Sequence, residues 1–231
     1  MGLRAQGVVA LPDESQGRAP DPTLSRLSLY LRCLRRLVKE GVGTISSAEL
    51  EGHCGIAAVQ IRKDLSYFGE FGRPGIGYEG QHLLARLTEI MHLDRQHRVV
   101  IVGAGNLGSA LAGYSGFVLS PFRVVGIFDN NFNKIGRRLW DLEILDVQRL
   151  AKANKQLKAN MGLVAVPADA AQEAADLLVK AGIRAILNFA PKIIEVPEAV
   201  ALRNVDLTRE LEVLCYFTDV PPAEADDSSG D

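Results

Sequence analysis

The sequence contains few of the features that build disulfide-bonded or membrane-spanning proteins. Its 231 residues include three cysteines, which lie far apart at Cys33, Cys54 and Cys215 and form no C-x-x-C pair. We therefore expect reduced, mostly buried thiols rather than a disulfide framework or a thiol switch. No apolar run approaches the roughly 18 residues that cross a bilayer, and the run at 8–11 is too short for the core of a signal peptide. These absences predict a cytoplasmic globular protein with no membrane partner.

Histidine is scarce where a redox enzyme would need it. All four histidines, at positions 53, 82, 92 and 97, precede residue 99, and no tyrosine is followed by lysine four positions later. A dehydrogenase needs a side chain that moves the proton accompanying the hydride. The C-terminal half lacks the usual acid–base groups of such enzymes, so we expect no enzymatic activity.

Charge is distributed unevenly, although the formal net charge is only −2. Residues 22–78 hold eight Lys/Arg and five Asp/Glu, whereas residues 99–231 hold 13 basic and 17 acidic residues. With 47% hydrophobic and 23% charged residues, the composition is otherwise that of an ordinary globular protein. A basic N-terminal half is compatible with binding a nucleic acid.

Residues 22–92 have the element order of a winged helix-turn-helix domain. Apolar residues spaced by three and four positions predict a first helix, and Ser46-Ser47-Ala48-Glu49 has the S-x-x-E capping box that starts a second one. Gly55 is expected to end this short helix, and a third helix follows at once. Such an order is typical of a domain that binds DNA. We expect helices over 24–38, 46–54, 56–68 and 81–92, and a hairpin around a turn at 73–75.

The third helix and the hairpin carry the side chains that we expect to contact DNA. The helix places polar and basic residues opposite its apolar stripe, directly after a glycine turn. An isolated basic helix is more often only a solvated face, but its place in this compact unit favours DNA binding. The predicted contact residues are Gln60, Arg62, Lys63, Ser66, Tyr67, Arg73, Gly75 and Tyr78.

Residues 98–205 alternate between strand and helix patterns. Continuous Val/Ile/Leu runs between helices indicate a parallel sheet that is covered on both faces. A last helix within 206–218 is apolar on most of its surface and needs to be buried, whereas the ends 1–21 and 219–231 are expected to be disordered. We predict strands at 99–102, 124–128, 162–166, 185–188 and near 205, and helices at 107–114, 146–158 and 170–181. The fold class is therefore α/β.

The stretch VVIVGAGNLGSAL at 99–111 is a strand that ends in a glycine-rich turn and opens a helix. Gly103, Gly105 and Gly108 allow a tight turn and let the backbone approach a pyrophosphate at the helix N-terminus. Asp129, 21 residues after Gly108, can accept hydrogen bonds from ribose hydroxyls and repel a 2′-phosphate. No arginine follows it immediately, so the pattern favours NAD over NADP. The open alternatives are a Rossmann-like domain that holds CoA and one that holds no nucleotide.

Four segments together resemble the Rex family of redox-sensing transcriptional repressors. They are QIRKDLSYFGEFGRPGIGY, VVIVGAGNLGSALAGYSGF, VAVPADAAQEAADLLVKAGIRAILNFAP and NVDLTRELEVLCYF. The resemblance implies a homodimer with a winged helix, a Rossmann domain that binds NADH or NAD⁺, and a C-terminal helix exchanged between subunits. It also implies that NADH, sensed and not consumed, releases the protein from pseudo-palindromic operator DNA of respiratory and fermentative genes.

The resemblance further implies which residues bind the dinucleotide and couple it to DNA. Tyr114 is expected near the nicotinamide, where it meets Asp206 of the partner subunit, and Asp206 is expected to pair with Arg32. From the residues alone, Asp206 could only cap its helix, Arg32 could be solvated and Tyr114 could belong to the core. Two departures from the family pattern are Leu207, where Phe or Tyr is common, and Pro74, where a basic residue is usual. The expected cofactor-binding residues are Gly103, Ala104, Gly105, Asn106, Leu107, Gly108, Asp129, Tyr114, Pro167 and Asn188, with no metal site.

Two other function classes stay open at this point. One is a ligand-responsive DNA-binding protein whose Rossmann-like half binds CoA, because the segment 165–187 also resembles CoA-binding domains. The other is a small oxidoreductase with a basic accessory domain. The affinities of the purified protein for NADH, NAD⁺, NADPH and acyl-CoA discriminate among the three.

Overall fold

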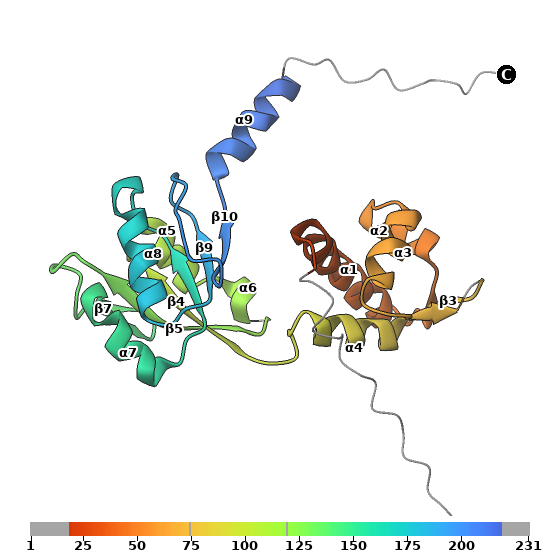
Figure 1. The fold of residues 1–231 in the computed structure, drawn as a ribbon, viewed down its shortest axis with the longest axis horizontal. Helices are drawn as coiled ribbons and strands as arrows, with labels where there is room; N and C mark the ends of the chain where they lie inside the picture. The colour runs from red at the N-terminus through yellow and green to blue at the C-terminus, as the bar shows by residue number, and fades with distance from the viewer. Residues whose placement is uncertain (1–18, 74, 119, 219–231) are drawn as a thin grey trace, which may run out of the picture. The chain divides into compact units, whose positions relative to one another are not determined.

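The structure is a computed structural model that describes residues 19–73, 75–118 and 120–218. The chain divides into two compact units with the boundary between Arg95 and Gln96 (Figure 1). The predicted tails lie outside the described residues, apart from residues 19–21. Of these, Asp21 is already helical, so the first helix begins within the segment that was expected to be a tail.

In its described residues, the N-terminal unit packs four helices with a small antiparallel sheet (Figure 1). The helices are α1 (Asp21–Lys39), α2 (Ser47–Cys54), α3 (Ala58–Ser66) and α4 (Gly80–Ile90). The strands, in the spatial order β1-β3-β2, are β1 (Thr44–Ile45), β2 (Gly72–Arg73) and β3 (Gly77–Glu79). The sequence predicted these helices and the hairpin, but not β1, which pairs with β3.

Local sequence explains where the short elements begin and end. The N–H of Glu49 donates to Ser46 Oγ at 3.1 Å and the N–H of Ser46 donates to Glu49 Oε2 at 2.6 Å, which is the predicted capping box. Gly55 ends α2 in the left-handed conformation, with a φ of 66°. A Cβ at Gly77 would lie 2.7 Å from the carbonyl oxygen of Ile45, so β3 approaches β1 closely because residue 77 has no side chain.

The core of the N-terminal unit is built from the apolar stripes that the helical periodicity predicts. Ile61 and Leu65 bury the inner side of α3 against α1 and its neighbours. Because α3 is held by this core, its outer side is presented on a fixed platform. The buried set is Leu27, Tyr30, Leu31, Leu34, Leu37, Ile45, Leu50, Ile61, Leu65, Leu83 and Leu87.

Within its described residues, the C-terminal unit contains a seven-stranded sheet in the order β10-β9-β8-β4-β5-β7-β6. All neighbouring strands are parallel except β6 and β7, which form an antiparallel hairpin at one edge. The strands are β4 (His97–Val102), β5 (Phe122–Asp129), β6 (Arg138–Leu139), β7 (Leu142–Asp146), β8 (Met161–Val164), β9 (Ala185–Asn188) and β10 (Ala201–Asn204). The helices are α5 (Asn106–Ala112), α6 (Ser115–Val118), α7 (Leu150–Leu157), α8 (Ala171–Lys180) and α9 (Leu207–Thr218). This is the predicted Rossmann-type parallel sheet.

Helices cover both faces of the sheet (Figure 1). Along β4, Val100 and Val102 belong to the core shared with α7 and α8, whereas Val99 and Ile101 belong to the core beneath α5. Alternate residues of a strand face opposite sides, so a strand covered on both sides is apolar at every position. The uninterrupted VVIV run of the sequence has this cause.

Parts of the C-terminal unit differ from the prediction. The sequence predicted no strand where β6 and β7 lie, and the helix expected from Asp146 begins only at Leu150. The N–H of Gln148 donates to Asp146 Oδ1 at 2.9 Å, so a capped 3₁₀ turn over Val147–Arg149 separates β7 from α7. The helix expected over 107–114 ends at Ala112, and Tyr114 lies between α5 and α6.

Candidate dinucleotide site and nucleic-acid interface

The glycine turn between β4 and α5 is shaped by close backbone contacts. Gly103 has a φ of 105°, and a Cβ there would lie 2.3 Å from the carbonyl oxygen of Ala165. A Cβ at Gly108 would lie 1.8 Å from the carbonyl oxygen of Gly103, whereas a Cβ at Gly105 would meet nothing within 4 Å. Gly103 and Gly108 therefore let the chain pack on itself, and Gly105 leaves the outer side of the turn open to a ligand.

A hollow of about 370 Å³ lies beside this turn, at the carboxyl ends of β4, β5 and β8. β5 and β8 flank β4 on opposite sides, so the hollow lies at the switch point where α/β sheets bind ligands. Of the predicted cofactor-binding residues, Gly103, Gly105, Asp129 and Pro167 line it. The other lining residues are Val102, Asn130, Asn131, Lys134, Val147, Ala165, Val166, Asp169, Ala170, Glu173, Ala174 and Leu177.

Asp129 ends β5 as a buried carboxylate with three hydrogen-bond donors around it. The N–H of Ala104 donates to Oδ2 and the N–H of Asn131 to Oδ1, each at 2.8 Å. Lys134 Nζ lies 3.1 Å from Oδ2. Burial alone would raise the pKa of Asp129, but these backbone N–H groups and the ammonium hold it below its usual range. Asp129 is therefore ionised at neutral pH and can accept hydrogen bonds from a ligand.

Lys134 was not among the predicted site residues, because it lies five positions after Asp129, beyond the two asparagines that directly follow the aspartate. The N–H of Lys134 donates to the carbonyl oxygen of Asn131 at 2.9 Å, and this turn folds the lysine back onto the end of β5. An Asn-rich stretch after the acidic residue was the available signal, since asparagine favours such turns.

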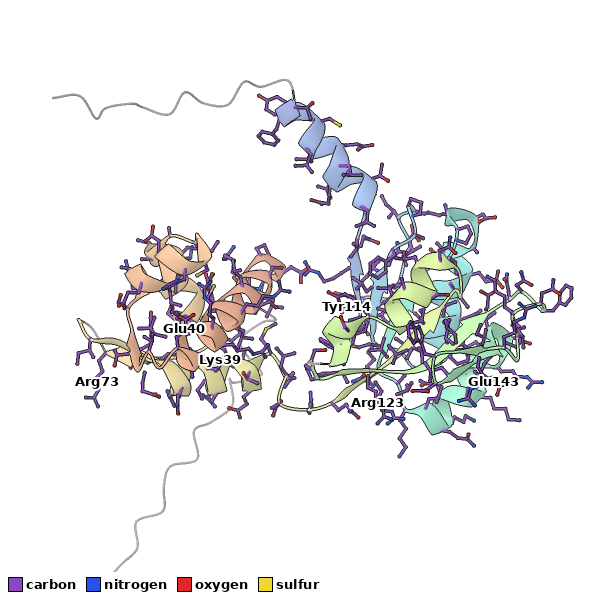
Figure 2. All side chains as sticks on the ribbon, turned by 180° about the vertical axis from the view of Figure 1, so that it is seen from behind. Lys39, Glu40, Arg73, Tyr114, Arg123 and Glu143 are labelled. Carbon is purple, nitrogen blue, oxygen red and sulfur yellow. The ribbon has the colours of Figure 1, made fainter. Side chains whose placement is uncertain are left out.

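Six of the ten predicted cofactor-binding residues are not among those that line the hollow: Ala104, Asn106, Leu107, Gly108, Tyr114 and Asn188. Tyr114, which is labelled in Figure 2, is 55% exposed. Its ring packs edge-on against that of Phe117, with the ring centroids 5.2 Å apart. Asn188 is fully buried, and its amide donates to the carbonyl oxygens of Ala190 and Lys192 and to Asn204 Oδ1. The Asn188 side chain thus fixes the loop after β9 and the end of β10.

In the N-terminal unit, a buried carboxylate joins α3 to α1. Arg26 donates to Asp64 through Nε at 2.6 Å and through Nη2 at 2.8 Å, and the Tyr30 hydroxyl donates at 2.8 Å. Burial acts to raise the pKa of Asp64, but the hydrogen bonds from Arg26, Tyr30 and Gln60 lower it to about 2. The charge at Asp64 therefore holds the two helices together at neutral pH.

This cluster corrects the expected orientation of Gln60. Its side chain is half-buried rather than on the outer face, and Nε2 donates to Asp64 Oδ1 at 2.9 Å. Four other predicted contact residues of this segment are exposed: Arg62, Lys63, Ser66 and Tyr67. Arg62 Nη1 donates to Ser47 Oγ at 2.7 Å, which links α3 to the start of α2. The exposed face of α3 is therefore basic and polar, as predicted, without the Gln60 amide.

The hairpin and α3 border a second hollow of about 680 Å³. It brings together five of the predicted DNA-binding residues: Arg62, Ser66, Arg73, Gly75 and Tyr78. Arg73 projects from the hairpin (Figure 2). Gly75 has a φ of 78°, and the N–H of Ile76 donates to the carbonyl oxygen of Arg73 at 3.1 Å, which agrees with the turn predicted at 73–75 and is typical of type II. Pro74 lies outside the described residues.

Arg32 and Asp206, which are expected to couple dinucleotide binding to DNA binding, are both exposed within their own units. Arg32 is exposed on α1. Asp206 precedes α9, and the N–H groups of Thr208 and Arg209 donate to its Oδ1 at 3.0 and 3.2 Å, so it caps the helix. Every residue of α9 is exposed, although the helix is rich in apolar side chains. The large ones are Leu207, Leu211, Val213, Leu214, Tyr216 and Phe217.

The cysteines agree only in part with the expectation of buried thiols. Cys33 is buried and Cys54 half-buried, but Cys215 is exposed on α9. The Cys33 thiol donates to the carbonyl oxygen of His53 at 3.5 Å, so the fold brings it beside Cys54. Burial raises the pKa of Cys54 to about 11, which keeps it a poorly reactive thiol at neutral pH.

The described residues contain no group of three or more His, Cys, Asp or Glu side chains that could hold a metal ion. In the same ranges, no helix is both long and apolar enough to cross a membrane.

Comparison with known families gives one match for each unit. Residues 18–66 match the family described as putative DNA-binding protein N-terminus. Residues 94–192 match the CoA binding domain, in agreement with the resemblance of segment 165–187.

Proteins named redox-sensing transcriptional repressor Rex are similar to this chain over most of its length. The protein of Carboxydothermus hydrogenoformans is 46% identical over 199 residues, which cover 86% of this chain and 96% of the relative. That of Chloroflexus aggregans is 43% identical over 204 residues, which cover 88% and 96%. The solved structure of RSP in complex with β-NAD⁺ and operator DNA has a TM-score of 0.82 at 41% identity, over 87% of this chain and 93% of RSP. RSP in complex with β-NADH has a TM-score of 0.77 at 40% identity, over 87% and 94%. The chain therefore belongs to the Rex family of redox-sensing transcriptional repressors.

Proposed function

We propose that this chain works as a homodimeric repressor that senses the ratio of NADH to NAD⁺. Its N-terminal unit binds operator DNA, and its C-terminal unit binds the dinucleotide in the hollow beside Gly103 and Asp129. The observation that carries the dinucleotide assignment is the ionised, buried Asp129 next to a glycine turn at the switch point of the sheet. The complexes of RSP with β-NAD⁺ and operator DNA, and with β-NADH, support it.

We further propose that the dinucleotide is a signal and not a reactant, and that the protein acts in the cytoplasm, where its operator lies. The match to the CoA binding domain makes acyl-CoA the competing ligand. Calorimetry of the purified chain with NADH, NAD⁺, NADPH and acyl-CoA tests the ligand assignment, and we expect NADH to bind tightest. We also expect the absorbance of bound NADH to stay constant over time, because a sensed dinucleotide is not oxidised. Tighter binding of acyl-CoA than of NADH would contradict it.

Replacing Arg62 or Lys63 by alanine is expected to weaken operator binding by about tenfold or more, because each change removes a cation from the exposed face of α3. NADH affinity should stay the same, since the change lies in the other unit. Loss of a phosphate contact should also flatten the dependence of log affinity on log salt by about one unit. Lys180→Ala removes the same charge from α8 and serves as the control. Normal operator affinity in both the Arg62 and Lys63 variants would mean that another surface reads the DNA.

The switch has to arise at the nicotinamide, because NADH and NAD⁺ differ only there, by one positive charge and by ring planarity. Contacts that are equal in both forms, such as those of Asp129, shift no conformational equilibrium. We place the discriminating contacts at Tyr114, together with Leu207 and Asp206 of the partner subunit. An apolar wall disfavours the charged ring and so favours NADH. In the DNA-competent form, Asp206 instead pairs with Arg32.

Tyr114→Phe and Asp206→Ala are expected to keep NADH affinity within about tenfold while reducing the NADH-driven loss of operator affinity, for which about 5- to 150-fold is the usual coupling range. Arg32→Ala should weaken operator binding directly. Operator binding titrated with NADH at fixed NAD⁺ measures all three.

Asp206→Asn separates the two roles of Asp206. Asparagine caps helices as well as aspartate does but carries no charge. A smaller NADH-driven loss of operator affinity in Asp206→Asn than in wild type supports the ionic role of Asp206. A loss equal to that of wild type means that Asp206 acts only as a helix cap.

A further inference from the structure

A second charged side chain stands at the end of β5, beside Asp129. Lys134 lines the hollow with its side chain 37% exposed, and its Nζ lies 3.1 Å from Asp129 Oδ2. The backbone of its turn is held by Asn131, whose carbonyl oxygen accepts from Lys134 at 2.9 Å and from Ile135 at 3.2 Å. The turn therefore positions the Lys134 backbone after the end of β5, and the ion pair with Asp129 positions its ammonium.

The hydrogen-bonding capacity of this pair is only partly used. Asp129 Oδ2 accepts from Ala104 and Lys134, and Oδ1 accepts from Asn131. A carboxylate offers about four acceptor positions and an ammonium offers three donors. One acceptor position on Oδ1 and further N–H groups on Lys134 remain for a ligand. A free acceptor beside a free donor matches the two neighbouring hydroxyls of a ribose. One hydroxyl can donate to the carboxylate, and the other can accept from the ammonium.

The charge of this corner differs from that of an isolated aspartate. Among the described residues that line the hollow, Lys134 is the one basic side chain, beside the acidic Asp129, Asp169 and Glu173. An aspartate alone would repel a nucleotide with a 2′-phosphate on its adenosine ribose. With an ammonium 3.1 Å away, part of that repulsion is offset, and the phosphate meets a cation at the same place.

We propose that Lys134 is a specificity-determining residue for the dinucleotide, which donates to an adenosine ribose hydroxyl and weakens the rejection of 2′-phosphorylated dinucleotides by Asp129. This inference rests on the proposed dinucleotide site and names the residue that sets how strictly NADH is preferred over NADPH. Lys134 and Asp129 act on that preference in opposite directions.

The test is calorimetry of the full-length chain with NADH and with NADPH, for wild type, Lys134→Gln and Asp129→Asn. Glutamine keeps a donor near the ribose but has no charge. We expect Lys134→Gln to weaken NADPH by about tenfold or more, the value of a charge-assisted hydrogen bond, and to weaken NADH by much less, so that the preference for NADH widens. Asp129→Asn should narrow the preference. Lys155→Gln on α7 removes the same charge away from the hollow and should leave both affinities unchanged.

The outcomes separate the inference from the function on which it rests. An NADH preference that stays the same or narrows in Lys134→Gln overturns the inference, because Lys134 then only orients Asp129. The same titrations with ADP-ribose and its 2′-phosphorylated form remove the nicotinamide and should show the same widening. Wild-type protein that binds neither NADH nor NAD⁺ overturns the proposed function itself.

Discussion

Replacing Asp64 by asparagine is expected to destabilise the N-terminal unit by about 3 kcal/mol, the lower end of the range for breaking a buried ion pair. The change leaves Arg26 without its anionic partner and gives the Tyr30 hydroxyl a neutral acceptor in place of a carboxylate. The Asp64 side chain is only 2% exposed, so water cannot reach this position to act as an acceptor in place of the carboxylate. Arg26 is 26% exposed, so its unpaired charge can be partly hydrated. This partial exposure of Arg26 places the expected cost at the lower end.

The same cluster predicts a dependence of stability on pH. The pKa of Asp64 falls from an ordinary value of 3.8 to about 2 in the folded protein. A depressed pKa means that folding favours the ionised form, so its stabilisation is complete above pH 3.8 and is lost as the pH falls toward 2. Asp64→Asn should remove this part of the acid sensitivity.

Hydrogen exchange of the α1 and α3 amides measures the effect within this unit alone, which matters because the chain has two units that can unfold separately. We expect much faster exchange in Asp64→Asn at neutral pH, and convergence with wild type near pH 2. Glu40→Gln, an exposed change just after α1, is the matched control. Wild-type protection in Asp64→Asn would show that the ion pair contributes nothing beyond what a neutral amide supplies.

Ending the chain after Asp206 is expected to abolish the stable dimer and leave protein that aggregates. The deleted helix α9 carries six large apolar side chains, all exposed in the isolated chain. Burial of one such side chain contributes about 1.5–3 kcal/mol, so a partner that covers several of them gains enough to make the exchanged helix a main part of the dimer. In the proposed homodimer, its removal would also uncover the surface of the other subunit that α9 is expected to cover, which favours aggregation.

Sedimentation and light scattering of the truncated chain provide the measurement. Leu211→Asp together with Leu214→Asp should have the same effect without a deletion, because charges then replace two of the apolar contacts. Glu212→Ala changes an exposed polar residue of the same helix and should leave the dimer intact. A monodisperse, well-folded monomer after truncation would contradict the exchange of α9.

Much of the fold could be predicted because its signals are local. The spacing of Leu24 to Val38 predicted α1, and the capping box at Ser46 and the left-handed Gly55 predicted the limits of α2. The VVIV run predicted a strand buried on both faces. The β6–β7 hairpin was missed because short strands depend on pairing with a neighbour, and their own pattern is weak.

The site residues divide in the same way into those encoded by local sequence patterns and those whose surroundings depend on the fold. Gly103, Gly105 and Asp129 were predicted from their spacing, since a glycine turn and an acidic strand end are encoded within one strand–helix–strand unit. Gln60 was assigned to the wrong side of α3, because the helical period alone does not reveal that Asp64 is buried and draws the amide inward. Asn188 was assigned to the cofactor, but its side chain is occupied by backbone and Asn204 partners from residues 190–204.

The class of this protein follows from local patterns in its sequence: a winged helix before a Rossmann sheet, with a dinucleotide turn and an apolar last helix. These follow from periodicity, caps and glycine positions, which act over a few residues. The electrostatics of both units, by contrast, depend on the packed fold. Asp64 is held ionised by Arg26 from another helix, and Asp129 by N–H groups and a lysine that converge on it. Such charges depend on burial and on groups brought together from distant parts of the chain, and no local pattern records either.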